Sequence, residues 1–212
     1  ITKSIIMKKI LVCLLIFSYF NTYSQITLGK EGTFANKWHE GKLVLKNKDT
    51  LKGLVKFQDI SKNITGFSLS NKVKFKENET SKKDKFKRKK IDYFEVINNS
   101  GEKVKYTYKK VKLQGLKLLK IEEEGKVSLY TDNYSYWTSE PVNMYKSGIS
   151  IYIQKEDEKK VNDLFLPNAF SSFKKKAKKY FADCASLVKG LENGKYKRKD
   201  FIEIVKIYNN CQ

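Results

Sequence analysis

Apolar and polar residues alternate along much of the chain, and the clearest example is the segment 41–57. Here leucine, valine and phenylalanine alternate with lysine on both sides of the polar link Asn47-Lys48-Asp49-Thr50. A period of two is typical of strands that have one buried and one solvent-facing side. Asn and Asp favour turns because their side chains hydrogen-bond the nearby backbone and tolerate left-handed conformations. The segment therefore predicts a β-hairpin.

The same alternation recurs as far as about residue 155. It is present in the segments 65–75, 91–97, 103–112, 116–121, 126–130 and 149–153. Turn residues such as Asn98-Asn99-Ser100-Gly101 separate these segments. Short strands at such spacing, with Gly and Asn in the turns, are typical of antiparallel architectures. We therefore predict a mainly β domain over residues 25–165, built either as an antiparallel β-sandwich or as a partly open barrel.

From about residue 168 the apolar residues recur at helical spacing instead. The apolar set is Phe170, Phe173, Ala177, Tyr180, Phe181 and Cys184, and lysines cover the opposite side. This pattern predicts a C-terminal helical appendage over residues 166–212. Its basic first helix either docks on the β domain or lies on an anionic membrane surface.

Two further helices are expected within the appendage. Asp183 is a candidate cap for a short helix that runs to about Glu192. Asp200 followed by Glu203 resembles a capping box and would open the last helix.

Residues 1–24 have the organisation of an export signal. Residues 1–6 precede the expected initiator Met7, the basic pair Lys8-Lys9 follows, and residues 10–17 form an apolar run too short to span a bilayer. Small residues before position 25 predict cleavage after Ser24, which would also remove Cys13. We therefore predict an exported mature chain, periplasmic or extracellular, without a transmembrane segment.

The mature chain would keep two cysteines, Cys184 and Cys211. A cysteine pair in an exported protein suggests one disulfide. It would close a loop of about 27 residues, which the chain-entropy model values at roughly 3–4 kcal/mol. Two free thiols or two metal ligands are the alternatives, although two cysteines and one distant histidine do not make a four-ligand zinc site.

The chain is strongly basic. Its formal net charge is +21, and about +18 once the three lysines of residues 1–24 are removed. Such a charge favours nucleic acid, lipid head groups or acidic glycans as partners. Only Arg88 and Arg198 are arginines, the residue that reads phosphate and guanine by bidentate contacts, so nucleic acid is the least expected. The plain alternative is a solvated lysine surface produced by an AT-rich genome.

Two stretches are candidate binding surfaces. The basic run 82–90, with Lys87, Arg88 and Lys89, could hold phosphate backbones or acidic glycans. As an exposed loop or edge strand, the same lysines would oppose aggregation between sheets.

The second stretch is the aromatic-rich segment 130–145, which includes Tyr134, Tyr136 and Trp137. Rigid amphipathic rings make good contact surfaces for sugars or peptides. The alternative is that these rings pack on the edge of the sheet.

Catalytic motifs are absent from the sequence. His39 is the single histidine and stands beside Trp38, and no nucleophile elbow, HExxH, P-loop, GxGxxG or EF-hand pattern occurs. No metal or cofactor is therefore predicted. The acidic clusters 122–124 and 156–158 lie in turns beside lysines. We predict a non-enzymatic binding module for an envelope protein or an anionic glycan. The alternative is a hydrolase that acts on envelope polysaccharide or peptide through Asp and Glu carboxylates.

Several motifs together resemble a family of uncharacterised exported proteins from Bacteroidetes. The junction Thr22-Tyr23-Ser24-Gln25 is similar to the signal ends of that family. Trp38 and Gly41, followed by Asp49-Thr50-Leu51 and Gly53, resemble its W-x-x-G…G-D-T-L-x-G hairpin, with Lys48 in place of the glycine. The ending resembles its F…Y-F…C…Y-N-x-C tail through Phe173, Tyr180-Phe181, Cys184, Tyr208-Asn209 and Cys211. The resemblance implies an envelope location and a β domain with a helical tail, and it implies no activity.

Overall fold

The computed structural model describes residues 37–57, 72–111, 114–137, 145–163 and 172–211, with the backbone alone for 133–137 and 145–147. The chain divides into two units, residues 1–31 and 32–212, and every described residue belongs to the second. The predicted signal and its cleavage point therefore lie outside the described residues, as do residues 65–71 of the second predicted strand segment.

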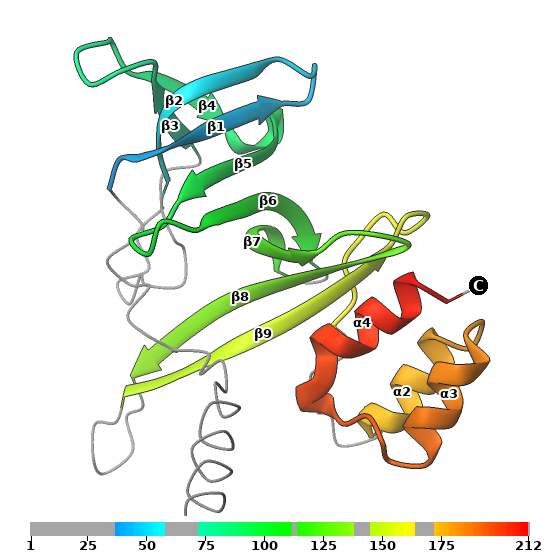
Figure 1. Ribbon diagram of the computed structural model, residues 1–212. Helices are drawn as coiled ribbons and strands as arrows, with labels where there is room; N and C mark the ends of the chain where they lie inside the picture. The colour runs from blue at the N-terminus through cyan, green and yellow to red at the C-terminus, as the bar shows by residue number, and fades with distance from the viewer. Residues whose placement is uncertain (1–36, 58–71, 112–113, 138–144, 164–171, 212) are drawn as a thin grey trace, which may run out of the picture. The chain divides into compact units, whose positions relative to one another are not determined.

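The described strands form one antiparallel sheet with the order β4-β3-β2-β1-β5-β6-β7-β8-β9 (Figure 1). The strands are β1 His39–Leu45, β2 Thr50–Lys56, β3 Lys72–Lys76, β4 Asp84–Lys87, β5 Ile91–Ile97, β6 Lys103–Val111, β7 Gly115–Glu123, β8 Val127–Trp137 and β9 Tyr145–Lys155. The prediction of a mainly β, antiparallel fold is confirmed. The described strands do not close into a barrel, since β4 and β9 end the order.

The first predicted hairpin is confirmed as β1 and β2, in which Leu43 lies opposite Leu51. Its turn is held by its own side chains, because Asn47 Nδ2 donates to Asp49 Oδ2 at 2.6 Å. Lys48 in this turn has a φ of 74°, in the left-handed region.

The sheet curls over its own apolar face at the β1 end. Phe86 of β4 and Leu118 of β7 contact the same buried cluster, although five strands separate β4 from β7 in the sheet. The buried members are Leu43, Val55, Phe57, Val73, Phe75, Ile91, Phe94 and Val96. This arrangement corresponds to the partly open alternative of the prediction.

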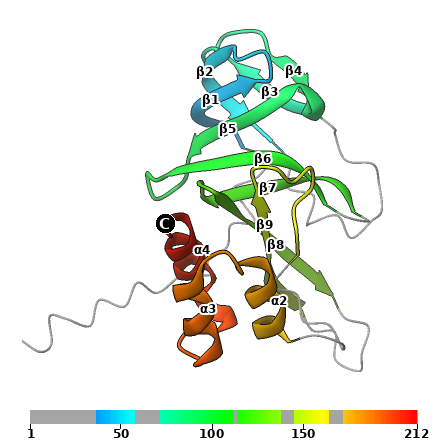
Figure 2. The same ribbon diagram turned by 90° about the vertical axis from the view of Figure 1, so that its right-hand side faces the viewer.

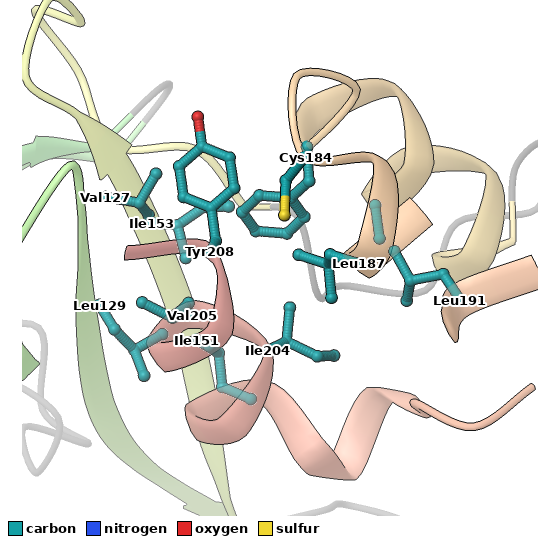
Figure 3. Close-up of a cluster of buried hydrophobic side chains, with 12 residues drawn as sticks. Val127, Leu129, Ile151, Ile153, Cys184, Leu187, Leu191, Ile204, Val205 and Tyr208 are labelled. Atoms are coloured by element: carbon teal, nitrogen blue, oxygen red, sulfur yellow. The ribbon is translucent and has the colours of Figure 1, made fainter. Parts of the chain in front are cut away.

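Three helices cover the other end of the same sheet: α2 Phe173–Tyr180, α3 Ala185–Glu192 and α4 Phe201–Asn209. Figures 1 and 2 show them beside β8 and β9. Their apolar sides share a buried cluster with these strands, made of Val127, Leu129, Ile151, Ile153, Ala177, Phe181, Cys184, Leu187, Leu191, Ile204, Val205 and Tyr208. In Figure 3 the side chains of α4 lie between those of the strands and those of α3. The predicted helical appendage is thus present, and α2 docks on the sheet.

One predicted helix cap is wrong, and the other is correct in position but not in its side-chain contact. Cys184, not Asp183, is the N-cap of α3, and it makes no side-chain capping bond. The Asp183 carboxylate instead accepts a hydrogen bond from Tyr208 Oη at 2.6 Å. Asp200 is the N-cap residue of α4, as predicted, but its side chain makes no capping bond to α4, because its Oδ2 accepts from the Lys197 amide at 2.8 Å, at the start of the 3-10 helix η4 Arg198–Asp200. The carboxylate of Asp183 is bound by a partner 25 residues away, whereas that of Asp200 is bound three residues upstream, at the start of η4.

A third buried cluster lies on the opposite side of the sheet, around Tyr130 and Tyr152. Tyr130 follows Leu129 directly, and successive strand residues point to opposite sides. None of the described helices is long and apolar enough to span a membrane.

Candidate binding surfaces

The outward side of β2, β3 and β4 carries a group of lysines that we call the lysine face: Lys56, Lys72, Lys74, Lys85 and Lys87. Lys56 lies opposite Lys74, and Lys74 lies opposite Lys85, so these three form one row across the strands. Lys72 and Lys87 oppose each other in a second row. Residues directly opposite in an antiparallel pair project to the same side of the sheet.

The sequence neighbours of these lysines fix the direction in which they point. Val55, Val73 and Phe75 are buried in the cluster inside the curl, and Phe86 packs against it. Because successive residues of a strand alternate in direction, the lysines between and beside them point outward. Lys72, Lys85 and Lys87 are exposed, while Lys56 and Lys74 are half-buried.

None of the five lysines forms an ion pair with any carboxylate among the residues that the structure describes. The lysines on the same side of β1 and β6 are different. Lys42 lies 3.5 Å from Glu95, and Lys105 lies 2.6 Å from Glu124. Lys105 Nζ is also 4.2 Å from the centre of the Tyr93 ring.

The three basic residues singled out from the sequence are separated by the structure. Lys87 is the last residue of β4 and belongs to the lysine face. Arg88 begins the 3-10 helix η3 Arg88–Lys90, and its guanidinium donates to the Leu116 carbonyl of β7 at 3.2 Å, while Lys89 is exposed. Burial raises the pKa of the nearby Tyr108 to about 12, and the positive charge of Arg88 acts against that rise.

Residues 84–87 of this run form β4, which lies at one edge of the sheet among the described strands, as the edge-strand alternative expected. The basic run 82–90 contains only two of the five lysines of the lysine face, Lys85 and Lys87. Lys56, Lys72 and Lys74 come from other strands, and only the pairing register unites them with Lys85 and Lys87.

The predicted aromatic surface falls in the second half of β8. The backbone of Tyr134 pairs with Gly148, that of Tyr136 with Lys146 and that of Trp137 with Tyr145, all in β9. The side chains of these three aromatic residues lie outside the described part of the chain.

A pocket of about 360 Å³ lies where the end of β9 meets α2, and no sequence pattern predicted it. Its lining is Lys155, Glu158, Lys176, Lys179 and Tyr180. Tyr180 Oη donates to Glu158 Oε2 at 2.7 Å, and the Lys155 amide donates to both groups. Burial and the Glu158 charge raise the pKa of Tyr180 above its ordinary range. These contacts join the end of β9 to α2. Most polar groups of the pocket therefore stabilise the packing of the helix on the strand.

The acidic clusters also have structural partners. Glu122 accepts from Thr131 Oγ1 at 2.6 Å, and Glu123 and Glu124 pair with lysines of α4 and β6. Glu158 anchors Tyr180.

The single histidine, His39, is buried at the start of β1, and its ring centre lies 6.3 Å from that of Phe57. Within the described ranges, no group of three or more His, Cys, Asp or Glu side chains could hold a metal ion.

The end of the chain is fastened to the rest of the structure by three neighbouring contacts. Cys211 forms a disulfide with Cys184, with the Cα atoms 6.0 Å apart, which confirms the predicted bridge. Asn209 uses its side chain as a backbone mimic: its Oδ1 accepts from the Val127 amide at 2.8 Å, and its Nδ2 donates to the Val127 carbonyl at 3.0 Å. Lys126 Nζ donates to the Cys211 carbonyl.

Comparison of the chain with protein-family models, with curated proteins and with solved structures finds no match.

Proposed function

We propose that this chain is an exported, non-enzymatic interaction module that binds an anionic partner of the cell envelope, either a protein or a glycan. The observation that carries the proposal is the disulfide between Cys184 and Cys211. Disulfides persist in oxidising compartments outside the cytosol. The export signal predicted for residues 1–24 leads to the same location.

The charge balance supports an anionic partner. The chain has 44 basic and 23 acidic residues, so one-to-one pairing would still leave 21 basic side chains without an acid. A protein with such an excess attracts polyanions and anionic surfaces over several ångströms.

The alternative of a hydrolase acting through carboxylates has no specific observation in its favour. In the acidic clusters 122–124 and 156–158, four glutamates have close contacts in the described structure. Each of them binds a lysine, a threonine or a tyrosine: Glu122, Glu123, Glu124 and Glu158. The proposal is therefore confined to binding.

The proposal is tested in two steps on the full chain. In cells that export it, mass spectrometry is expected to find a mature N-terminus at Gln25, and thiol titration of the denatured, unreduced protein is expected to find no free thiol. The purified protein is then expected to capture protein or glycan from an envelope extract at low salt and to release it at high salt, because long-range charge attraction is screened. An uncleaved intracellular chain with two free thiols, or no capture above a bare-resin control, would contradict the proposal.

A further inference from the structure

We infer that the lysine face of β2, β3 and β4 is the binding site and that its partner is a linear anionic polysaccharide. The inference rests on the proposed function and adds the place and the chemical class. Its starting point is the geometry of the two rows, Lys56–Lys74–Lys85 and Lys72–Lys87.

The arrangement opposes the stability of the sheet. Like charges directly opposite on neighbouring strands destabilise their pairing, because the Cβ atoms are only about 4.5–5.5 Å apart. The lysine face contains three such pairs: Lys56 with Lys74, Lys74 with Lys85, and Lys72 with Lys87. Removing any one of these charges would relieve the repulsion, so folding alone does not explain the face.

The same sheet shows the arrangement that stability favours. On the same side of the sheet, the row through Lys42 runs Lys52, Lys42, Glu95, Lys105, so it also begins with an opposed lysine pair. From β1 to β6, however, lysine and glutamate alternate, with Lys42 3.5 Å from Glu95. Opposed lysines also occur as Lys42–Lys52 and Lys109–Lys117, but one member of each of these pairs forms an ion pair, Lys42 with Glu95 and Lys117 with Asp132. General lysine richness explains opposed lysines in both regions, but it does not explain why the five lysines of the lysine face have no such carboxylate among the described residues.

The spacing of the charges fits a repeating polymer. Neighbouring strands are about 4.8 Å apart, and residues two positions apart along a strand are separated by about 6.6 Å. The lysine face is thus a grid of ammonium groups over three strands. A polymer with regularly repeated charges can contact several of them at once, whereas a single small anion would contact one or two.

The side-chain types favour a polysaccharide over the other polyanions. Single-stranded nucleic acid binding uses aromatic side chains on which bases stack. Membrane binding at an interface uses large apolar side chains beside the basic ones. The outward residues of the three strands are Thr50, Lys52, Leu54, Lys56, Lys72, Lys74, Lys76, Lys85 and Lys87, which include no aromatic residue. The ring of Trp38, which precedes β1, lies 5.1 Å from Lys76 Nζ and is a single aromatic side chain beside these strands, already in contact with that ammonium. A partner held by lysine point charges alone carries carboxylates or sulfates along a flexible chain.

The test compares two triple variants of the full chain. Lys56→Gln/Lys74→Gln/Lys85→Gln removes one row. Lys159→Gln/Lys189→Gln/Lys199→Gln removes the same charge from exposed positions elsewhere. Binding to polygalacturonate and to heparin is measured by calorimetry at several salt concentrations, with duplex DNA, single-stranded DNA and phosphatidylglycerol vesicles as competing probes.

We expect the wild type to bind at least one of the two polysaccharides. The row variant should lose about tenfold or more of this affinity and show a smaller salt slope, because fewer counterions are released on binding. The control variant should change by less than about threefold, since it alters only the net charge. The melting temperature of the row variant should be equal to or above that of the wild type, which a merely misfolded variant would not show.

Equal losses in both variants would overturn the assignment of the face. Tighter binding to DNA or vesicles than to either polysaccharide would overturn the partner class, and so would failure to bind both polysaccharides. Capture from envelope extract judges the proposed function separately, because a protein partner would still be recovered there.

Discussion

Lys48 occupies a backbone conformation that favours glycine. Its φ of 74° lies in the left-handed region, which costs a residue with a Cβ atom about 1–2 kcal/mol. Lys48 Nζ lies 3.0 Å from Asp92, but this pair is exposed and such pairs contribute little.

We therefore expect Lys48→Gly to raise the free energy of unfolding by about 0.5–1 kcal/mol. The gain is less than the full relief of strain, because glycine also increases the entropy of the unfolded chain. Urea denaturation measures the change. Lys46→Gly in the same turn is the control, because Lys46 has no positive φ, and it should not be stabilised. A Lys48→Gly protein less stable than the wild type would show that the turn is not strained.

At the scale of single residues, the sequence predicted partners that are near in the chain and missed those that are far away. The turn chemistry of Asn47 and Asp49 was readable, because both groups belong to one local motif. The partner of Asp183 was not, because Tyr208 lies 25 residues away and reaches it only after α4 has docked. The left-handed backbone of Lys48 is likewise visible only in the structure.

Asn209 is the contact that docks the end of α4 on β8. Its side chain exchanges two hydrogen bonds with the backbone of Val127. Removing one side of a partly buried hydrogen bond leaves its partner unsatisfied, at a cost of about 1–3 kcal/mol.

We expect Asn209→Ala to lower the free energy of unfolding by about that amount, 1–3 kcal/mol, and to speed hydrogen exchange at the Val127 amide. The adjacent Asn210 supplies the matched control. Its Nδ2 donates to the Lys206 carbonyl within the same helix end and is exposed, so Asn210→Ala should cost less than about 0.5 kcal/mol. Equal effects of the two substitutions would contradict the docking role.

The disulfide closes the tail on itself, with α3 and α4 inside the loop between Cys184 and Cys211. A loop of 27 residues corresponds to roughly 3–4 kcal/mol in the chain-entropy model. We expect the double variant Cys184→Ser/Cys211→Ser to lose up to this amount.

The loss should be concentrated in the tail, because the cluster inside the curl of the sheet contains no residue of the helices. Hydrogen exchange should therefore increase in α3 and α4 before it increases in β1 and β5. Uniform loss of protection over sheet and helices would indicate that the tail and the sheet unfold as one unit.

Asp183 makes the junction between tail and sheet sensitive to acid. The hydrogen bond from Tyr208, together with the Lys155 ammonium 3.5 Å away, lowers the pKa of its carboxyl below the ordinary value of 3.8. A group with a lowered folded pKa contributes stability above its unfolded pKa, and this contribution is lost as the pH falls through the folded pKa. Because the group is largely exposed, solvent screening limits the contribution to less than about 1 kcal/mol.

We expect Asp183→Asn to be less stable than the wild type at neutral pH, and the difference to shrink as the pH falls below about 4. Urea midpoints between pH 7 and pH 2 measure this. Asp157→Asn alters an exposed carboxylate that forms no hydrogen bond or ion pair with the described residues, and it is the control, expected to change the midpoint little. A difference for Asp183→Asn that grows in acid would reverse the sign of the argument.

At the scale of elements, the sequence predicted the types of structure and their places along the chain. The segment 91–97 matches β5, Ile91–Ile97, because its alternation and its following Asn-Gly turn are both local signals. The prediction could not give the order of strands, because β1 and β5 are neighbours in the sheet although β2, β3 and β4 lie between them in the chain. Without that order, five lysines from three strands could not be recognised as one face.

At the scale of the whole molecule, the excess of positive charge acts against folding as well as in favour of binding. A net charge far from zero destabilises the compact state through self-repulsion, which salt screens with a Debye length of about 30 Å at 0.01 M and about 8 Å at 0.15 M. The lysine face concentrates this repulsion, because its lysines oppose each other without acids among the described residues.

The melting temperature of the wild type should therefore rise as salt increases from about 0.01 to 0.15 M. The row variant Lys56→Gln/Lys74→Gln/Lys85→Gln should show a smaller rise than the control variant Lys159→Gln/Lys189→Gln/Lys199→Gln, although both carry the same net charge. Both variants lose three positive charges, but only the row variant loses charges that lie directly opposite other lysines. A bound polyanion should raise the melting temperature of the wild type as salt does. Its effect should be larger than that of salt, because it neutralises the opposed lysines directly. Equal salt dependence of the two variants would mean that repulsion is spread over the surface and that the lysine face has no special place in it.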